Sequence, residues 1–171
     1  MAFPYKRRRF MSIIAQSTFS FFACLFFAII YKTPKSELVA CGITGAFGYG
    51  AYYTYYVNTN EPMFATFIGA VTVAFIAKLY ASSRKLPVML YVLPPIFPLV
   101  PGANIYYAAY GVIMENIPYA VANGVRAFKL SGLCVIALLI IFSIPDEIFD
   151  IITGVSRFNI VEKEENNSIK N

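Results

Sequence analysis

Apolar positions along the chain gather into five long blocks, and short polar or charged turns separate them. The blocks cover residues 10–31, 38–57, 62–81, 86–114 and 117–144. A helix needs about 20 mostly apolar residues to cross the hydrocarbon core of a bilayer, and each block reaches that length. The pattern predicts an all-α membrane protein, a bundle of about five transmembrane helices.

The fourth block holds a run of closely spaced prolines, Pro94, Pro95, Pro98 and Pro101. A proline has no N–H to give to the carbonyl four residues earlier, and its ring clashes with that carbonyl. In lipid, each unpaired carbonyl costs several kcal/mol. We therefore expect one helix of the bundle to be broken by this Pro-rich segment, with the break facing protein or water.

The break itself suggests a binding site. Pro101-Gly102 fits the centre of a type II turn with Gly102 at positive φ, and a new helix can begin at Ala103-Asn104. Many transporters hold small ions and zwitterions at such broken helices. The candidate substrate-binding residues are Pro95, Pro98, Pro101, Gly102, Asn104 and Tyr106. The alternative is a kinked helix that only shapes the bundle.

Small residues recur at helical spacing in the second and third blocks. The candidate helix-packing residues are Gly42, Gly45, Ala46 and Gly50, with Ala65 and Gly69 in the next block. Helices in lipid gain little from the hydrophobic effect, so close association depends on small side chains. The stripes predict tight packing, either within one bundle or against another subunit.

The two ends of the chain have a different character. Residues 1–9 form a basic segment, residues 10–145 the transmembrane domain, and residues 146–171 a polar tail that begins with a short helix. Ser143 and Asp146 have the spacing of a capping box, and isoleucines then repeat at helical spacing. We expect a helix along the membrane surface that ends near Gly154, followed by disorder.

Composition narrows the function. The chain is 58% hydrophobic and 13% charged, and it has no histidine. Without histidine or a close pair of acids deep in a block, an enzyme, a metal site or a cofactor site is not expected. The net charge of +5 is spread over the turns, which argues against nucleic-acid binding. Lys78, near the end of its block, is expected to reach up to the lipid headgroups.

The distribution of positive charge suggests an orientation. Lysine and arginine gather on the cytosolic side of membrane proteins. Lys32, Lys35, Lys78, Arg84 and Lys85 fall on one side of a five-span arrangement, and the basic residues 6–9 fall on the other. The larger group favours an N-terminus outside and a C-terminus inside.

The proline run resembles the signature of the threonine/serine exporter family. That signature appears here as Pro95-Ile-Phe-Pro98-Leu-Val-Pro101-Gly102-Ala-Asn-Ile-Tyr106, and the glycine-rich block upstream is also similar. The resemblance covers roughly residues 10–145. It implies the small integral membrane subunit of an exporter, equivalent to the C-terminal half of full-length members.

This resemblance implies a function. Members export small amino acids or dicarboxylic acids of the threonine/serine or succinate type. It implies a multi-pass protein of the cell membrane, with a larger membrane subunit of the same family as partner, a small carboxylate or amino acid as substrate, and an oligomer as one possible assembly. The alternative is a non-transporting membrane scaffold or regulatory subunit, which would explain the glycine stripes but not the proline break.

Overall fold

The computed structural model describes the backbone of residues 3–153 and, within that range, the side chains of residues 11–146 and 148–152. Every regular element there is helical, which confirms the all-α prediction. The elements are α1 (Phe3–Ile30), α2 (Leu38–Thr59), α3 (Pro62–Arg84), α4 (Met89–Ile96), the 3-10 turn η1 (Phe97–Leu99), α5 (Gly102–Ile113), α6 (Ile117–Phe142) and α7 (Asp146–Thr153).

Three of these helices are long and apolar enough to cross a membrane. They are the Met11–Ile30 part of α1, then α3 and α6. α4 and η1 together with α5, which meet at a bend of 54°, have the length and composition of a fourth if the bent pair counts as one span. Glycine and tyrosine are only weakly hydropathic, so α2, which is rich in both, does not join this group although it has 22 residues. Length and composition thus support three to four spans, against the five expected.

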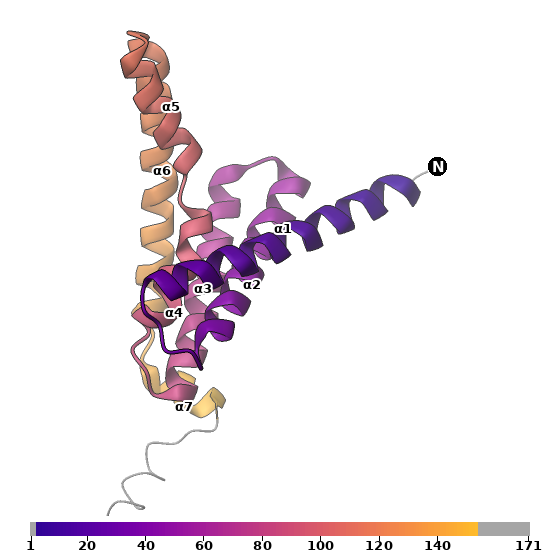
Figure 1. Ribbon diagram of the computed structural model, residues 1–171, viewed down its shortest axis with the longest axis vertical. Helices are drawn as coiled ribbons and strands as arrows, with labels where there is room; N and C mark the ends of the chain where they lie inside the picture. The colour runs from indigo at the N-terminus through magenta and orange to yellow at the C-terminus, as the bar shows by residue number, and fades with distance from the viewer. Residues whose placement is uncertain (1–2, 154–171) are drawn as a thin grey trace, which may run out of the picture.

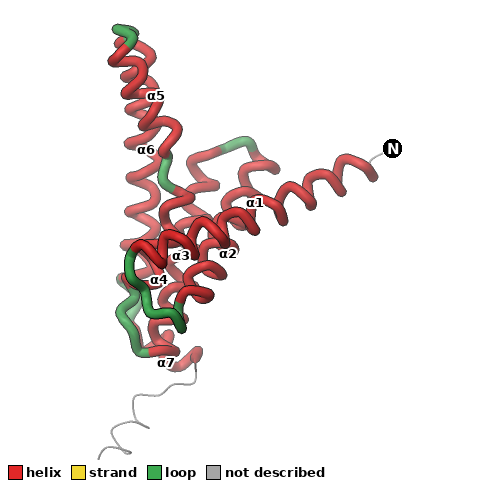
Figure 2. Tube along the Cα trace, in the orientation of Figure 1, coloured by secondary structure: helices red, strands yellow, loops and turns green. Residues whose placement is uncertain are grey.

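The helices form a packed bundle with two projections. Figure 1 shows α2 among α1, α3 and α4, and these neighbours are in contact. The N-terminal part of α1 extends to one side, while α5 and the first half of α6 extend together as a hairpin. Short loops join the helices, as Figure 2 shows. α7 packs against α3 at the opposite end of the bundle from that hairpin.

The bundle is held by close backbone contact. A Cβ atom added at Gly48 would lie 2.2 Å from Val73 Cγ2. One added at Gly69 would lie 3.1 Å from the Gly48 carbonyl oxygen. These distances leave no room for a side chain where α2 crosses α3. Alanine is the most frequent residue in the apolar core of the described chain, which includes Ala70, Ala74 and Ala77 of α3, all fully buried.

Four turns end with a residue in the left-handed region that favours glycine. These residues are Lys32, Asn60, Lys85 and Glu115, with φ of 55° to 56°. Asn60 and Lys85 are the C-caps of α2 and α3, and their N–H groups bond to Tyr56 and Ala81 carbonyls. The nine described glycines all lie inside helices instead. The chain uses glycine for packing and other residues for its turns.

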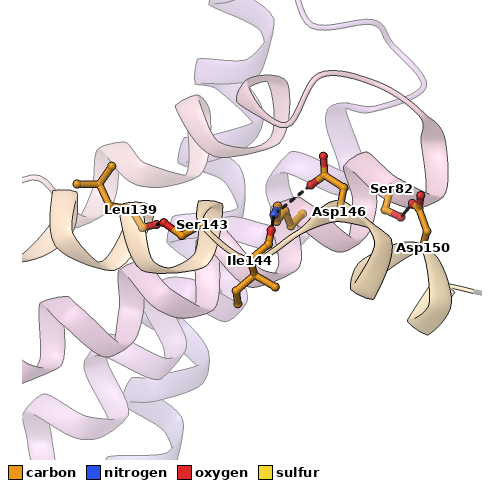
Figure 3. A network of polar contacts seen from close by, with 7 residues as sticks. Ser82, Leu139, Ser143, Ile144, Asp146 and Asp150 are labelled. Carbon is orange, nitrogen blue, oxygen red and sulfur yellow. Dashed lines mark hydrogen bonds and ion pairs between the residues drawn. The ribbon is translucent and has the colours of Figure 1, made fainter.

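The chain ends depart from the sequence expectations. α1 begins at Phe3, so its helix continues through the basic residues that were expected to form a separate segment. Ser143 is the C-cap of α6 instead of the N-cap of α7: its N–H donates to the Leu139 carbonyl, and its hydroxyl donates to the same carbonyl at 2.7 Å (Figure 3). α7 nevertheless begins at Asp146. The expected disorder after Gly154 lies outside the described residues.

Candidate functional site

The interruption of the fourth block is shorter than the proline count suggests. Pro94 and Pro95 lie inside α4, and Pro98 lies inside η1. The regular structure is lost only at Val100 and Pro101, before α5 begins at Gly102. The expected break is therefore present, but it occupies only the end of the Pro-rich segment. A proline's fixed φ is compatible with helical backbone, so the helix can continue where the freed carbonyls find other donors.

Two of the freed carbonyls have such donors. The Cys41 thiol of α2 donates to the Leu90 carbonyl at 3.4 Å. The Val100 N–H donates to the Phe97 carbonyl at 3.1 Å. The first contact comes from a neighbouring helix and the second from the 3-10 turn. Satisfaction by a neighbouring helix is how membrane helices tolerate proline, and here it keeps α4 helical.

The break itself is a tight turn around Pro101. Pro101 has φ −75° and ψ 57°, and the Gly102 N–H donates to the Val100 carbonyl at 2.7 Å. These are the features of an inverse γ-turn rather than the expected type II turn. Gly102 consequently has helical geometry as the first residue of α5, and positive φ is not needed. A Cβ atom added there would meet no atom within 4 Å.

The candidate binding residues lie in two environments. Pro95 is fully buried in the bundle and Pro98 is partly buried. Asn104 is partly buried on the first turn of α5, and Tyr106 is 62% exposed. The turn at Pro101 and Gly102 connects the two sets. All six residues lie along one interrupted helix. Some belong to its buried half, α4 with η1, and the others to its exposed half, α5.

The packing candidates line two helix crossings. Gly42, Gly45 and Gly50 face α1, where added Cβ atoms would lie 2.7 Å from Phe21, 2.1 Å from Cys24 Sγ and 2.8 Å from Ser17 Oγ. Gly45 also lies near the break, since its added Cβ would be 3.7 Å from Pro95 Cα. On α3, Ala65 and Gly69 are buried, whereas Ala46 of α2 is partly exposed.

A buried carboxylate fixes the start of α4. Glu37, the N-cap of α2, is only 3% exposed. Its Oε2 accepts a 2.7 Å hydrogen bond from the Tyr91 hydroxyl, and its Oε1 lies 3.1 Å from Arg84 Nη1. The Tyr91 hydrogen bond lowers the pKa of Glu37; burial opposes this, while Ser36 and Arg84 reinforce it. Three segments meet at this carboxylate, and sequence reasoning did not identify it.

Lys78 is buried rather than extended toward headgroups. Its side chain is 7% exposed, because α7 covers it. Its Nζ donates to the Ile144 carbonyl and lies 3.0 Å from Asp146 Oδ1 (Figure 3). The Phe149 ring, itself 1% exposed, lies 4.8 Å from the same nitrogen. The expected snorkelling of Lys78 is therefore corrected: the lysine holds α7 onto α3.

A pocket of about 500 Å³ lies beside this lysine. It is bounded by α3, α7, the end of α6 and the turn that precedes α4. Its lining residues are Lys78, Ala81, Ser82, Lys85, Leu86, Pro87, Val88, Phe142, Asp146 and Asp150. Ser82 donates a short hydrogen bond to Asp150 across its wall (Figure 3). None of the six candidate binding residues lines this pocket.

The outer part of the α5–α6 hairpin is apolar and exposed. We call residues 102–129 the distal arm. Its helices touch at Gly111, where an added Cβ would lie 2.8 Å from the Ala120 nitrogen. Phe128 is 81% exposed and Ile113 75% exposed. Arg126 and Lys129 are also exposed there, and neither forms an ion pair with any residue that the structure describes.

The described residues include no group of three or more cysteines, aspartates and glutamates placed to hold a metal ion. Cys24, Cys41 and Cys134 are buried free thiols. The chemistry available at the break, the pocket and the distal arm is hydrogen bonding and charge pairing. Such groups suit reversible binding of a small polar molecule.

Comparison with known proteins identifies the family. No curated protein and no solved structure matches the chain. The sequence model of one family, described as "Threonine/Serine exporter, ThrE", matches residues 16–144. The match covers more than half of the chain and includes every helix from α2 to α6. With its apolar helices and interrupted span, this membrane protein belongs to the threonine/serine exporter family.

Proposed function

We propose that this chain is a subunit of a multi-pass exporter in the cell membrane, working with a larger companion subunit of the same family. Its substrates are small amino acids of the threonine and serine type or small dicarboxylic acids. The observation that carries the proposal is the helix interrupted at Pro101, with one half buried and the other exposed. Interrupted helices of this kind form the substrate sites of many transporters.

The proposed contact with substrate lies at the start of α5. The first N–H groups of a helix have no partner within the helix and carry the positive end of its dipole. The Gly102 N–H already donates to the Val100 carbonyl, so a substrate carboxylate would bind at the N–H groups of Ala103 and Asn104, with the Asn104 side-chain amide donating beside it. Pro101 forms the turn, Gly102 leaves open space at the first residue of α5, and Tyr106 follows one turn later. Pro95 and Pro98 lie in the helical segment that leads to this turn.

The companion subunit is supported by the distal arm. Lipid can cover its exposed apolar side chains, but it cannot pair the charges of Arg126 and Lys129 along a membrane helix. A second membrane protein that presents acidic or polar groups can pair them. The same contact would place the companion beside α5, so that the two subunits enclose the proposed substrate contact between them.

Substrate efflux from loaded cells tests the proposal. Cells lacking this gene product should export threonine or succinate more slowly, and the chain together with its companion should restore the rate. Asn104→Leu should keep normal abundance in the membrane but reduce efflux per inserted protein, since it removes polar contacts without changing backbone geometry. Wild-type efflux by Asn104→Leu, with loss of efflux only in distal-arm variants, would favour the scaffold role instead.

A further inference from the structure

The pocket beside Lys78 contains both signs of charge. Lys78 and Lys85 contribute two positive charges, and Asp146 and Asp150 contribute two negative charges. The charged groups therefore balance, while Leu86, Val88 and Phe142 provide apolar wall. Small-molecule sites are typically clefts of about 300–1,000 Å³ with mostly apolar walls and a few placed polar groups. The volume of about 500 Å³ falls in that range.

We propose that this pocket binds a small zwitterion of the α-amino acid class, with its carboxylate on Lys78 and its ammonium on Asp146. The proposal rests on the proposed function and adds a second binding site, separate from the start of α5. It also selects between the two proposed substrate classes, because the pocket suits an amino acid and not a dicarboxylic acid.

The Lys78–Asp146 pair is suited to exchange with such a ligand. Lys78 is nearly fully buried, so its ammonium needs an anion or carbonyl close by. The Asp146 side chain is 66% exposed and can move without uncovering the core. A zwitterion that binds between the two side chains pairs its carboxylate with Lys78 and its ammonium with Asp146. One ion pair is thereby replaced by two, and the Ile144 carbonyl keeps its hydrogen bond to Lys78.

A dicarboxylate would be disfavoured at the same position. Its first carboxylate can pair with Lys78, but its second would lie among the Asp146 and Asp150 carboxylates. Like charges held close together repel, and unfavourable juxtaposition of charge costs several kcal/mol at an interface. A simple amine has no carboxylate to pair with Lys78, and its ammonium would be repelled by the Lys78 and Lys85 ammonium groups. Only a ligand with both charges matches both sides of the pocket.

The pocket is also connected to the interrupted helix. Val88 lines the pocket and directly precedes α4, the buried half of that helix. Ser82 and Lys85 belong to the last turn and cap of α3, whose Arg84 pairs with Glu37. A ligand here therefore touches the segment that holds the start of α4. This geometry suits a site that substrate visits before it reaches the break.

Equilibrium binding of radiolabelled threonine to the purified full-length chain tests the proposal. Saturable binding is expected, and unlabelled serine should compete while succinate and threonine methyl ester should not. Lys78→Met and Asp146→Asn should each weaken binding about tenfold or more, since hydrogen bonds to charged groups contribute about 1.5–3 kcal/mol. Lys35→Met is the matched control: this exposed lysine lies in the α1–α2 turn, away from the pocket, and should change nothing.

The result that overturns the proposal is absence of saturable binding by the folded wild-type chain. Equal binding by Asp146→Asn would do the same, and this variant changes an exposed side chain, so it separates loss of binding from misfolding. Competition by succinate as strong as that by serine would reject the zwitterion class. Efflux from cells is an independent measurement. If both variants bind threonine and export it as the wild type does, the pocket proposal is contradicted and the exporter role is not. If the wild-type chain binds threonine but no efflux is found, the exporter role is contradicted and the pocket proposal is not.

Discussion

α4 and α5 are the two halves of one interrupted helix, and they are stabilised in different ways. In α4, Tyr91, Val92, Pro94 and Pro95 are buried among α2, α3 and α1. In α5, only Gly111 is buried, and most other side chains are exposed. The first half is fixed by the chain's own close contacts and by the Glu37 carboxylate. The second half packs against α6, with close contact at Gly111, and the rest of its surface is left for lipid or a partner.

This difference separates stability from function along a single helix. Changes around α4 should alter folding whatever the partner, because the contacts lie within the chain. Changes along α5 and the distal arm should leave folding nearly unchanged and alter assembly or transport. Substitutions around α4 and substitutions in the distal arm can therefore test this division separately.

The largest effect is expected at Gly45. Gly45→Leu would force a side chain into the space of Cys24, whose Cβ lies only 2.8 Å from an added Cβ at Gly45. Overpacking of this kind typically costs about 1–3 kcal/mol. The thermal unfolding midpoint of the purified chain should fall clearly. Gly132→Leu is the control, because an added Cβ there meets nothing within 4 Å; an equal loss in both variants would contradict the packing assignment.

A slightly smaller effect is expected at Glu37. Glu37→Leu would leave the fully buried Tyr91 hydroxyl without its acceptor, at a cost of about 1–3 kcal/mol. Unfolding in denaturant measures this loss. Tyr91→Phe should restore part of the stability when combined with Glu37→Leu, since both partners are then apolar. Strictly additive losses in the double variant would show that the two side chains do not act together.

The same carboxylate predicts a pH dependence. The pKa of Glu37 is lowered in the folded chain, so ionised Glu37 favours folding. That contribution is fully present above the pKa of the unfolded chain, about 4.3 for glutamate. It is lost as pH falls from there through the lowered folded pKa. Stability measured from neutral to acidic pH should fall less steeply in Glu37→Gln, and an unchanged slope would remove Glu37 as a source of the dependence.

On the arm side, Arg126→Leu with Lys129→Leu should leave folding unchanged or slightly improved. Both side chains are exposed and lack ion-pair partners among the described residues, so nothing in the described chain loses a contact. If the proposed companion subunit binds the arm, its recovery on purification should fall several-fold. Recovery equal to wild type would place the companion's contact elsewhere. Lys35→Leu, also exposed but outside the arm, is the control for loss of charge.

The smallest effect is expected at Gly102. This residue begins α5 with helical geometry and open space around it, so Gly102→Ala should raise the free energy of unfolding by up to about 1 kcal/mol. A large loss would instead mean that Gly102 must adopt positive φ in another state of the exporter. Unfolding and efflux measured on the same variant distinguish these outcomes.

The sequence predicted the helices better than it predicted their contacts. Helix starts at Leu38, Pro62 and Ile117 agree with the apolar blocks, because hydropathy and proline at the first turn determine them locally. The interruption at Pro101 was also predicted, but not the helical backbone that continues through Pro94, Pro95 and Pro98 before it. Proline counting places a possible break at every proline, whereas the Cys41 donor that keeps α4 helical comes from another helix.

The polar sites could not have been found in the same way. Glu37 lies 47 positions before Arg84 and 54 before Tyr91, and only packing brings it to them. The available signals were an acid directly before an apolar block and a tyrosine within one. Lys78 appeared to be a lysine near a helix end, and its burial depends on α7, which lies across it from much later in the chain. Long-range contacts of this kind leave no local pattern.

The left-handed turn residues have a practical consequence. A residue with a Cβ atom in that conformation stores about 1–2 kcal/mol of local strain, and glycine relieves most of it. Lys32, Asn60 and Glu115 hold this conformation away from the pocket, the break and the glycine crossings. Substitution by glycine at these three turns should therefore give a more stable protein for purification and crystallisation. The pocket, the break and the glycine crossings would stay as they are.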